Sequence, residues 1–368
     1  MITSVYIVKS RVVYSLVILI FVFAAIGCLK VGPTSLKSER SKFNQAIQKT
    51  NDEQLLLNLV RLKYRDTPFF LEVSNVASQF RLKNKASFKA QLESMVKDIF
   101  NLGASTSYEQ SPTVSYSPLH GDKFVKNILS TLPLKTIALL FHSGWSVERV
   151  FRVSFQLLAE LENAPGASGP TPRNAPQYKE FLRAVKYLQE LDDKDYLNIN
   201  YQEPNDQPQM VLQISKDAKK TEPALEFARA VGTPSNKSMY ILNQFPTLDQ
   251  VEHLRVVPRS FLGIMFYLSQ SIQVPERDIL KGKVTLTKNP DGGKFDWFDV
   301  TGELLTIRSS AEEPSRATVR IFYRDTWFYI DDTDLDSKST FSLLTQIYAL
   351  QSGAIKDADP ILTIGIGS

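Results

Sequence analysis

Residues 331–336 (DDTDLD) form a dense run of carboxylates. Asp332, Asp334 and Asp336 stand at alternate positions, which is the spacing of the first three oxygen ligands in an EF-hand calcium loop. That loop next requires a glycine and, six residues later, a bidentate glutamate, but this chain has Ser337 and Leu343 there. The sequence therefore predicts no metal centre and leaves the three aspartates as a weak calcium candidate. Alternatively, these acids lie where a strand turns into a helix and interact favourably with the positive end of the helix dipole.

The sequence contains no catalytic motif together with the neighbours that the motif requires. Ser94 and Lys97 match Ser-x-x-Lys, but neither Ser-Asp-Asn nor Lys-Thr-Gly follows, and Gly-x-Ser-x-Gly does not occur. The three histidines, His120, His142 and His253, lack the spacing of a zinc site. Glycine-rich phosphate loops do not occur either. We therefore predict no catalytic residue and no cofactor, and we lean towards a protein that is not an enzyme.

Cys28 is the only cysteine, and it follows the longest apolar run in the chain. Lys9 and Arg11 precede residues 12–26 (VVYSLVILIFVFAAI), so a basic segment leads into an apolar one, which is the layout of a secretory signal. The apolar run is shorter than the roughly 20 residues that a membrane-spanning helix needs. An exported chain with one cysteine cannot form an intrachain disulfide, so its stability must come from packing.

Residues 25–28 (AIGC) resemble the lipobox of bacterial lipoproteins, with Ala25 where leucine is commoner. The resemblance implies cleavage between Gly27 and Cys28 and attachment of lipid, palmitate included, to the Cys28 thiol. Leu29 follows the cysteine in place of aspartate, which implies the outer membrane if sorting is of the enteric type. The alternative is an uncleaved signal anchor that happens to contain a cysteine.

Four further stretches are similar to a family of uncharacterised bacterial lipoproteins. This resemblance implies lipoprotein status and a shared fold, and it brings no catalytic residue with it. The middle of the chain, from about Asn163 to Val256, carries little of the similarity. The stretches are residues 56–61 with Tyr64, residues 112–119, residues 143–146, and residues 327–332 continuing to Phe341.

Composition shifts divide the chain into a leader, a tether and two domains. Residues 163–175 (NAPGASGPTPRNA) contain three prolines, two glycines and no large apolar side chain, which is typical of a linker. We expect a lipoprotein signal peptide at 1–27, a tether at 28–37, an N-terminal α+β domain at 38–162, the linker at 163–175, and a C-terminal α+β domain at 176–368.

Hydrophobic periodicity predicts an α+β fold. In the N-terminal domain, helices and strands include a helix over 51–64, where apolar residues recur at helical spacing, and a helix over 88–100. In the C-terminal domain we expect an antiparallel sheet packed against helices, ending in a helix over 341–350 that Asp336 or Ser337 caps. The strands expected there cover residues 284–287, 295–300, 304–307, 317–323 and 327–330.

The charge balance excludes one class of partner. Two of the 43 basic residues lie in the leader, so the rest of the chain carries 41 basic and 39 acidic side chains. A nucleic-acid-binding protein needs a strongly basic domain, so we expect no nucleic acid partner.

These observations favour a membrane-anchored lipoprotein that is a non-enzymatic scaffold, assembly or binding component of the cell envelope. Its expected partners are the membrane, through the lipid on Cys28, and an envelope protein complex. Its expected location is the outer membrane, facing the periplasm. One alternative is an envelope hydrolase acting on peptidoglycan, glycan or lipid, with Asp331, Asp332 and Glu303 as acid and base. Another is a carrier of an apolar ligand, which would require a large apolar cavity.

Overall fold

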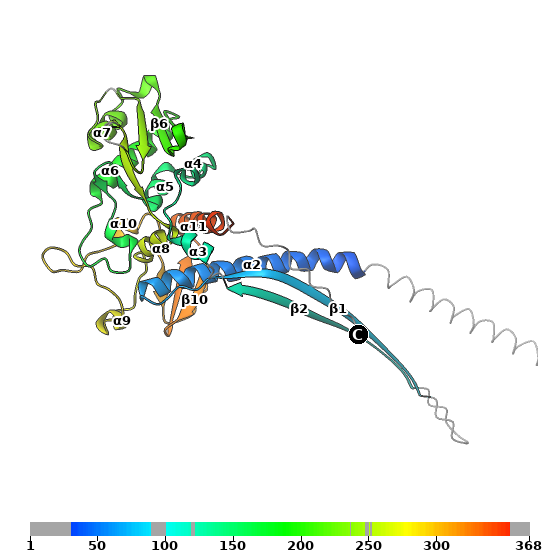
Figure 1. The fold of residues 1–368 in the computed structure, drawn as a ribbon. Coiled ribbons are helices and arrows are strands. Elements are labelled where there is room, and N and C mark those ends of the chain that lie inside the picture. The colour runs from blue at the N-terminus through cyan, green and yellow to red at the C-terminus, as the bar shows by residue number, and fades with distance from the viewer. Residues whose placement is uncertain are drawn as a thin grey trace, which may run out of the picture. The chain divides into compact units, whose positions relative to one another are not determined.

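The computed structural model describes residues 31–89, 101–118, 122–235, 237–246, 250 and 252–353 (Figure 1). Contacts along the backbone divide the chain into two units, Met1–Glu53 and Gln54–Ser368. Of the first unit, the structure describes residues 31–53, which belong to helix α2 (Val31–Lys63). The described part of the expected tether is therefore helical from Val31. Cys28 and Gly27 lie outside the described residues.

The second unit begins in the last turns of α2, where the predicted amphipathic helix is confirmed. Leu55, Leu56, Leu59 and Val60 are buried, at the spacing that places them on one face.

A two-stranded antiparallel sheet follows, formed by β1 (Leu71–Lys89) and β2 (Asn101–Pro118). Residues 90–100, most of the predicted helix over 88–100, lie outside the described residues, and Phe88 and Lys89 belong to β1.

A six-stranded mixed sheet has the order β4-β3-β8-β7-β6-β5. Its neighbours pair antiparallel except β7 and β8, which are parallel. Helix α4 contacts strands β5 and β6, and helix α6 contacts strands β4 and β5. Helix α7 contacts α6. The strands are β3 (Phe155–Leu158), β4 (Leu161–Glu162), β5 (Leu197–Gln202), β6 (Gln209–Ile214), β7 (Met239–Asn243) and β8 (Leu254–Pro258). The helices near it are α4 (Leu134–His142), α5 (Val147–Ser154), α6 (Lys179–Asp192) and α7 (Glu222–Ala230).

A smaller antiparallel sheet has the order β10-β11-β9 and confirms the two strands predicted at 317–323 and 327–330. Val319, Ile321, Phe328 and Ile330 alternate along two of its strands and are buried, so one face of the sheet joins the core. The strands are β9 (Arg308–Ser310), β10 (Ala317–Tyr323) and β11 (Thr326–Asp331). The remaining helices are α3 (Asp122–Leu129), α8 (Phe261–Ser269), α9 (Glu276–Leu280), α10 (Phe298–Thr301) and α11 (Leu335–Gly353). The fold is α+β, as the sequence predicts.

Strands on both sides of the expected linker share the six-stranded sheet: β3 and β4 precede residues 163–175, and β5–β8 follow them. Within this segment the structure has a short 3₁₀ turn, η1 (Pro165–Ser168), and Ala164 and Ala167 are buried. The division into two domains at this place stays a prediction.

Three of the predicted C-terminal strands do not form. Residues 284–287 are irregular, residues 304–307 are irregular apart from an isolated bridge at Ile307, and residues 295–300 end in helix α10. The Asp296 carboxylate accepts a hydrogen bond of 2.9 Å from the backbone N–H of Phe298, which starts a helical turn in place of a strand.

The cap predicted for the C-terminal helix is also wrong. The helix begins at Leu335, earlier than expected, and Asp334 caps it. The Asp334 carboxylate accepts hydrogen bonds from the backbone N–H of Ser337 at 3.0 Å and from its hydroxyl at 2.8 Å.

Across the described ranges, no helix is both long and apolar enough to cross a membrane.

Candidate functional site

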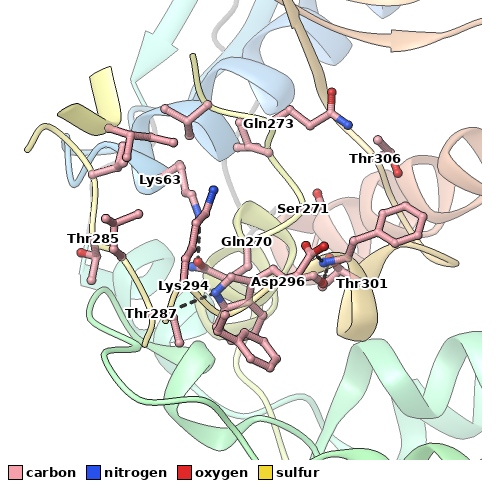
Figure 2. Close-up of a pocket in the computed structure, with 18 of the residues that line it drawn as sticks. Lys63, Gln270, Ser271, Gln273, Thr285, Thr287, Lys294, Asp296, Thr301 and Thr306 are labelled. Atoms are coloured by element: carbon pink, nitrogen blue, oxygen red, sulfur yellow. Dashed lines mark hydrogen bonds between the residues drawn. The ribbon is translucent and has the colours of Figure 1, made fainter. Parts of the chain in front are cut away.

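A cavity of about 420 Å³ lies in the second unit, between the end of α2 and the segments that flank α9 and α10 (Figure 2). The C-terminus of α2 forms one side of it, and two stretches about 200 positions later, residues 270–287 and 294–306, form the rest. Its described lining residues are Lys63, Gln270, Ser271, Ile272, Gln273, Val274, Ile279, Val284, Thr285, Leu286, Thr287, Lys294, Phe295, Asp296, Trp297, Phe298, Thr301, Leu305 and Thr306.

Lys63, the last residue of α2, brings an amine to the cavity wall. Its Nζ donates a hydrogen bond of 2.9 Å to Oε1 of Gln270, a neutral amide. It forms no ion pair with a carboxylate in the part of the chain that the structure describes. In Figure 2 the side chains of Lys63 and Lys294 extend into the same part of the cavity. The amine is therefore left with a neutral acceptor and a second cation as its neighbours.

These surroundings disfavour the charged form of Lys63. Burial is the larger cause and the positive charge of Lys294 the smaller, and together they lower the pKa of Lys63 from 10.5 to about 8. Near neutral pH the amine is thus mostly charged but carries an appreciable neutral fraction.

The side chain of Gln270, which accepts the hydrogen bond from Lys63, is itself held in place. It is buried, and its Nε2 donates to the backbone carbonyl of Phe266 at 3.1 Å and to Oγ of Ser269 at 3.3 Å. Because its amide nitrogen has these acceptors, its carbonyl oxygen is directed to Lys63. The C-terminus of α8 therefore fixes the orientation of the lysine.

Aromatic side chains form another wall of the cavity. The rings of Phe295 and Trp297 meet edge to face with centroids 5.2 Å apart. The Trp297 indole N–H donates to Oγ1 of Thr287 at 2.9 Å, and the Thr287 hydroxyl in turn donates to the carbonyl of Pro172. The Trp297 donor is thus already used, while Phe298, which also lines the cavity, is 63% exposed.

A second cavity of about 330 Å³ is strongly charged but internally paired. Arg152 contacts Glu148 at 2.7 Å and Glu303 at 3.1 Å, and Glu303 also lies 3.5 Å from Lys186. Its described lining residues are Ser146, Glu148, Arg149, Arg152, Lys186, Glu303, Leu304 and Asp336. Cations and carboxylates in this cavity form ion pairs with one another, whereas Lys63 has no carboxylate partner among the described residues.

The three aspartates of the calcium candidate have separate protein partners. Asp332 accepts from the Lys338 ammonium at 2.7 Å, Asp334 caps α11, and Asp336 accepts from the Arg149 guanidinium at 2.8 Å. Within the described ranges, no group of three or more His, Cys, Asp or Glu side chains could hold a metal ion. The structure does not bring the three carboxylates to one centre.

The carboxylates named for a hydrolase are likewise dispersed. Glu303 lies in the second cavity with Arg152 and Lys186, whereas Asp331 accepts from the backbone N–H and the hydroxyl of Thr333 at 2.9 and 2.7 Å. These hydrogen bonds lower the pKa of Asp331. Asp296 is the one carboxylate among the described residues of the larger cavity.

Sequence reasoning missed this larger cavity. Neither Lys63 nor Gln270 stands out in the sequence: Lys63 is a polar residue near the end of the helix predicted over 51–64, and Gln270 lies 207 positions away. No motif joins them, since only the fold brings the end of α2 to the end of α8.

Comparisons with protein-family models, with curated proteins and with solved structures returned no match to this chain.

Proposed function

We propose that this chain is a lipoprotein of the cell envelope that binds, without converting it, a small ligand with an acidic group and an apolar body. The lipid on Cys28 would anchor it to the outer membrane, facing the periplasm, and the cavity beside Lys63 would hold the ligand. The observation that carries the proposal is the Lys63 ammonium, which lines a cavity with a neutral amide as its hydrogen-bond acceptor.

Charge is the first argument for an acidic ligand. Removing an ammonium group from water is costly unless an opposite charge or several acceptors replace the water. Among the described residues Lys63 has one acceptor, and the cavity lining that they form contains two lysines, Lys63 and Lys294, against the single carboxylate of Asp296. A bound carboxylate or phosphate would supply the missing opposite charge.

Shape and lining are the second argument. Binding sites for small molecules have volumes of roughly 300–1,000 Å³ and combine apolar walls with a few well-placed polar groups. A cavity of about 420 Å³ falls in this range, and Phe295, Trp297 and Phe298 give it an aromatic wall. The ligand would place its apolar part against these rings and its acidic group between the two lysines.

The same features favour a binding protein over the two alternatives. A glycosidase-like hydrolase needs two carboxylates across one site, and Glu303 and Asp331 have partners of their own at other places. A carrier of purely apolar ligands would not need two lysines in its cavity. A binding component of an envelope complex is consistent with both the cavity and the proposed anchor.

Ligand binding to the full chain in detergent tests the proposal. Small aromatic carboxylates such as para-(hydroxymethyl)benzoate should raise the melting temperature, and their neutral amides should have a much smaller effect. Lys63→Met and Lys294→Met should each weaken binding of the acid by about tenfold or more, since hydrogen bonds to charged groups contribute about 1.5–3 kcal/mol.

Lys288→Met is the matched control, because Lys288 is exposed on the same loop as Lys294 but does not line the cavity. This variant should bind like the unmodified chain. Equal binding of the acids and their amides, or equal loss in all three variants, would refute an acid-binding cavity.

A further inference from the structure

The Lys63 amine is placed to react with a ligand as well as to attract it. We propose that Lys63 forms a reversible imine with an aldehyde or ketone group of the ligand, so that the cavity is a covalent capture site for carbonyl-bearing acids. This inference rests on the proposed function, because the same cavity must first bind the acid.

The hydrogen bonding of Lys63 suits a nucleophile. A lysine paired with a carboxylate is held in its charged form, which has no lone pair with which to attack. Lys63 instead donates to the Gln270 carbonyl oxygen at 2.9 Å, and a neutral amine can keep that bond through one N–H while its lone pair stays free. The Gln270 side chain is itself fixed through Phe266 and Ser269, so the amine is held at the wall of the cavity.

The charged neighbours act in the same direction. Of the described residues that line the cavity, the ionisable ones besides Lys63 are Lys294 and Asp296, both from the segment before α10. The segments 270–274 and 284–287 contribute amides, hydroxyls and apolar groups without a charge. A second cation beside a desolvated lysine is an arrangement that activates lysine nucleophiles, and the lowered pKa of Lys63, about 8, agrees with it.

The chemical step is balanced without any further reactant. The lone pair of the neutral Lys63 amine attacks the carbonyl carbon, and the C–N bond forms to give a carbinolamine. The C–O bond then breaks, and the carbonyl oxygen leaves as water with the two hydrogens of the amine. The product is a C=N bond between ligand and lysine, neither partner is oxidised or reduced, and water reverses the reaction.

The probe that fits these requirements is para-carboxybenzaldehyde, which carries an aldehyde, an aromatic ring and a carboxylate. Mild reduction with cyanoborohydride traps an imine as a stable secondary amine, and peptide mass spectrometry identifies the labelled lysine. A pKa of about 8 in place of 10.5 makes the neutral fraction near neutral pH roughly a few hundred times larger than for an ordinary lysine. Because a weaker base is also a weaker nucleophile, we expect Lys63 to be labelled at least about tenfold faster than the exposed Lys288.

Variants and a non-reactive analogue separate this proposal from the proposed function. Lys63→Arg should abolish the rapid labelling while keeping the charge, and Lys294→Met should slow labelling near neutral pH and move its pH midpoint upwards. The alcohol para-(hydroxymethyl)benzoate, which has no carbonyl carbon open to the amine, should compete with the aldehyde and protect Lys63.

Each outcome is decisive. If the alcohol binds in a Lys63-dependent way but the aldehyde labels lysines without preference, the imine is refuted and the acid-binding cavity stands. If the alcohol does not bind and Lys63 is not labelled preferentially, both proposals fail. Rapid labelling of Lys63 that the alcohol blocks supports both.

Discussion

The fully buried Arg259 and the half-buried Lys63 differ in their hydrogen-bond acceptors, and this difference distinguishes a structural role from a binding role. Arg259 is fully buried, and its guanidinium donates to the carbonyls of Arg152 at 3.1 Å, of Val153 at 3.3 Å, and of Phe155 and Asn163, and packs 4.1 Å from the Tyr267 ring centroid. Burial lowers its pKa to about 10, yet its donors have protein acceptors. Lys63 has three donors and, among the described residues, one acceptor on a cavity wall, so it has capacity left for a ligand.

Asp334 illustrates how an acidic residue can stabilise the fold without binding a metal. Asp334→Ala should lower the free energy of unfolding by about 1 kcal/mol, because the first turn of α11 loses the acceptor for the Ser337 N–H. Asp334→Asn should restore most of this loss, since asparagine is an equally good capping residue. Urea unfolding of the three chains measures the differences.

The control for this prediction is Asp332→Ala, two positions earlier. Asp332 is exposed and forms one surface ion pair with Lys338, which contributes at most about 1 kcal/mol and commonly less. If Asp332→Ala destabilises the chain as much as Asp334→Ala does, capping is not the role of Asp334.

At the scale of elements, hydrophobic periodicity correctly predicted the helices and strands that bury one face against the core and expose the other. The helix over 51–64 and the strands over 317–323 and 327–330 appear in the structure because each buries one face at its own period. Residues 295–300 were wrongly predicted as a strand since Phe295 and Trp297 alternate with polar residues. Both aromatic residues are indeed buried, but Asp296 binds the N–H of Phe298 and turns the chain into α10.

The candidate site could not be predicted from these local patterns. Its walls come from the end of α2, the end of α8 and the irregular segments around α9 and α10, and the hydrogen bond between Lys63 and Gln270 spans 207 positions. Nothing in the types of these residues distinguishes them from exposed lysines and glutamines. The feature that matters, an amine without a carboxylate partner in the described part of the chain, exists only after folding.

At the scale of the whole molecule, the proposed anchor determines where ligand binding would take place. Cys28→Ser removes the single thiol of the chain, so it should abolish palmitate labelling and move the protein from the membrane fraction to the soluble fraction. Labelling with palmitate and fractionation of cells that express each form measure both effects. Should palmitate incorporation and membrane association both survive, lipid is attached elsewhere and the proposed anchor is wrong.

The central claim is that the Lys63 ammonium binds the acidic group of a ligand. NMR titration of the isotope-labelled Lys63 Cε resonance tests it most directly. Without ligand, the midpoint should lie at about pH 8. With saturating para-(hydroxymethyl)benzoate it should move upwards, because a bound carboxylate stabilises the charged amine. A midpoint near the ordinary lysine value of 10.5, or a midpoint that the acid leaves unchanged, would contradict the account.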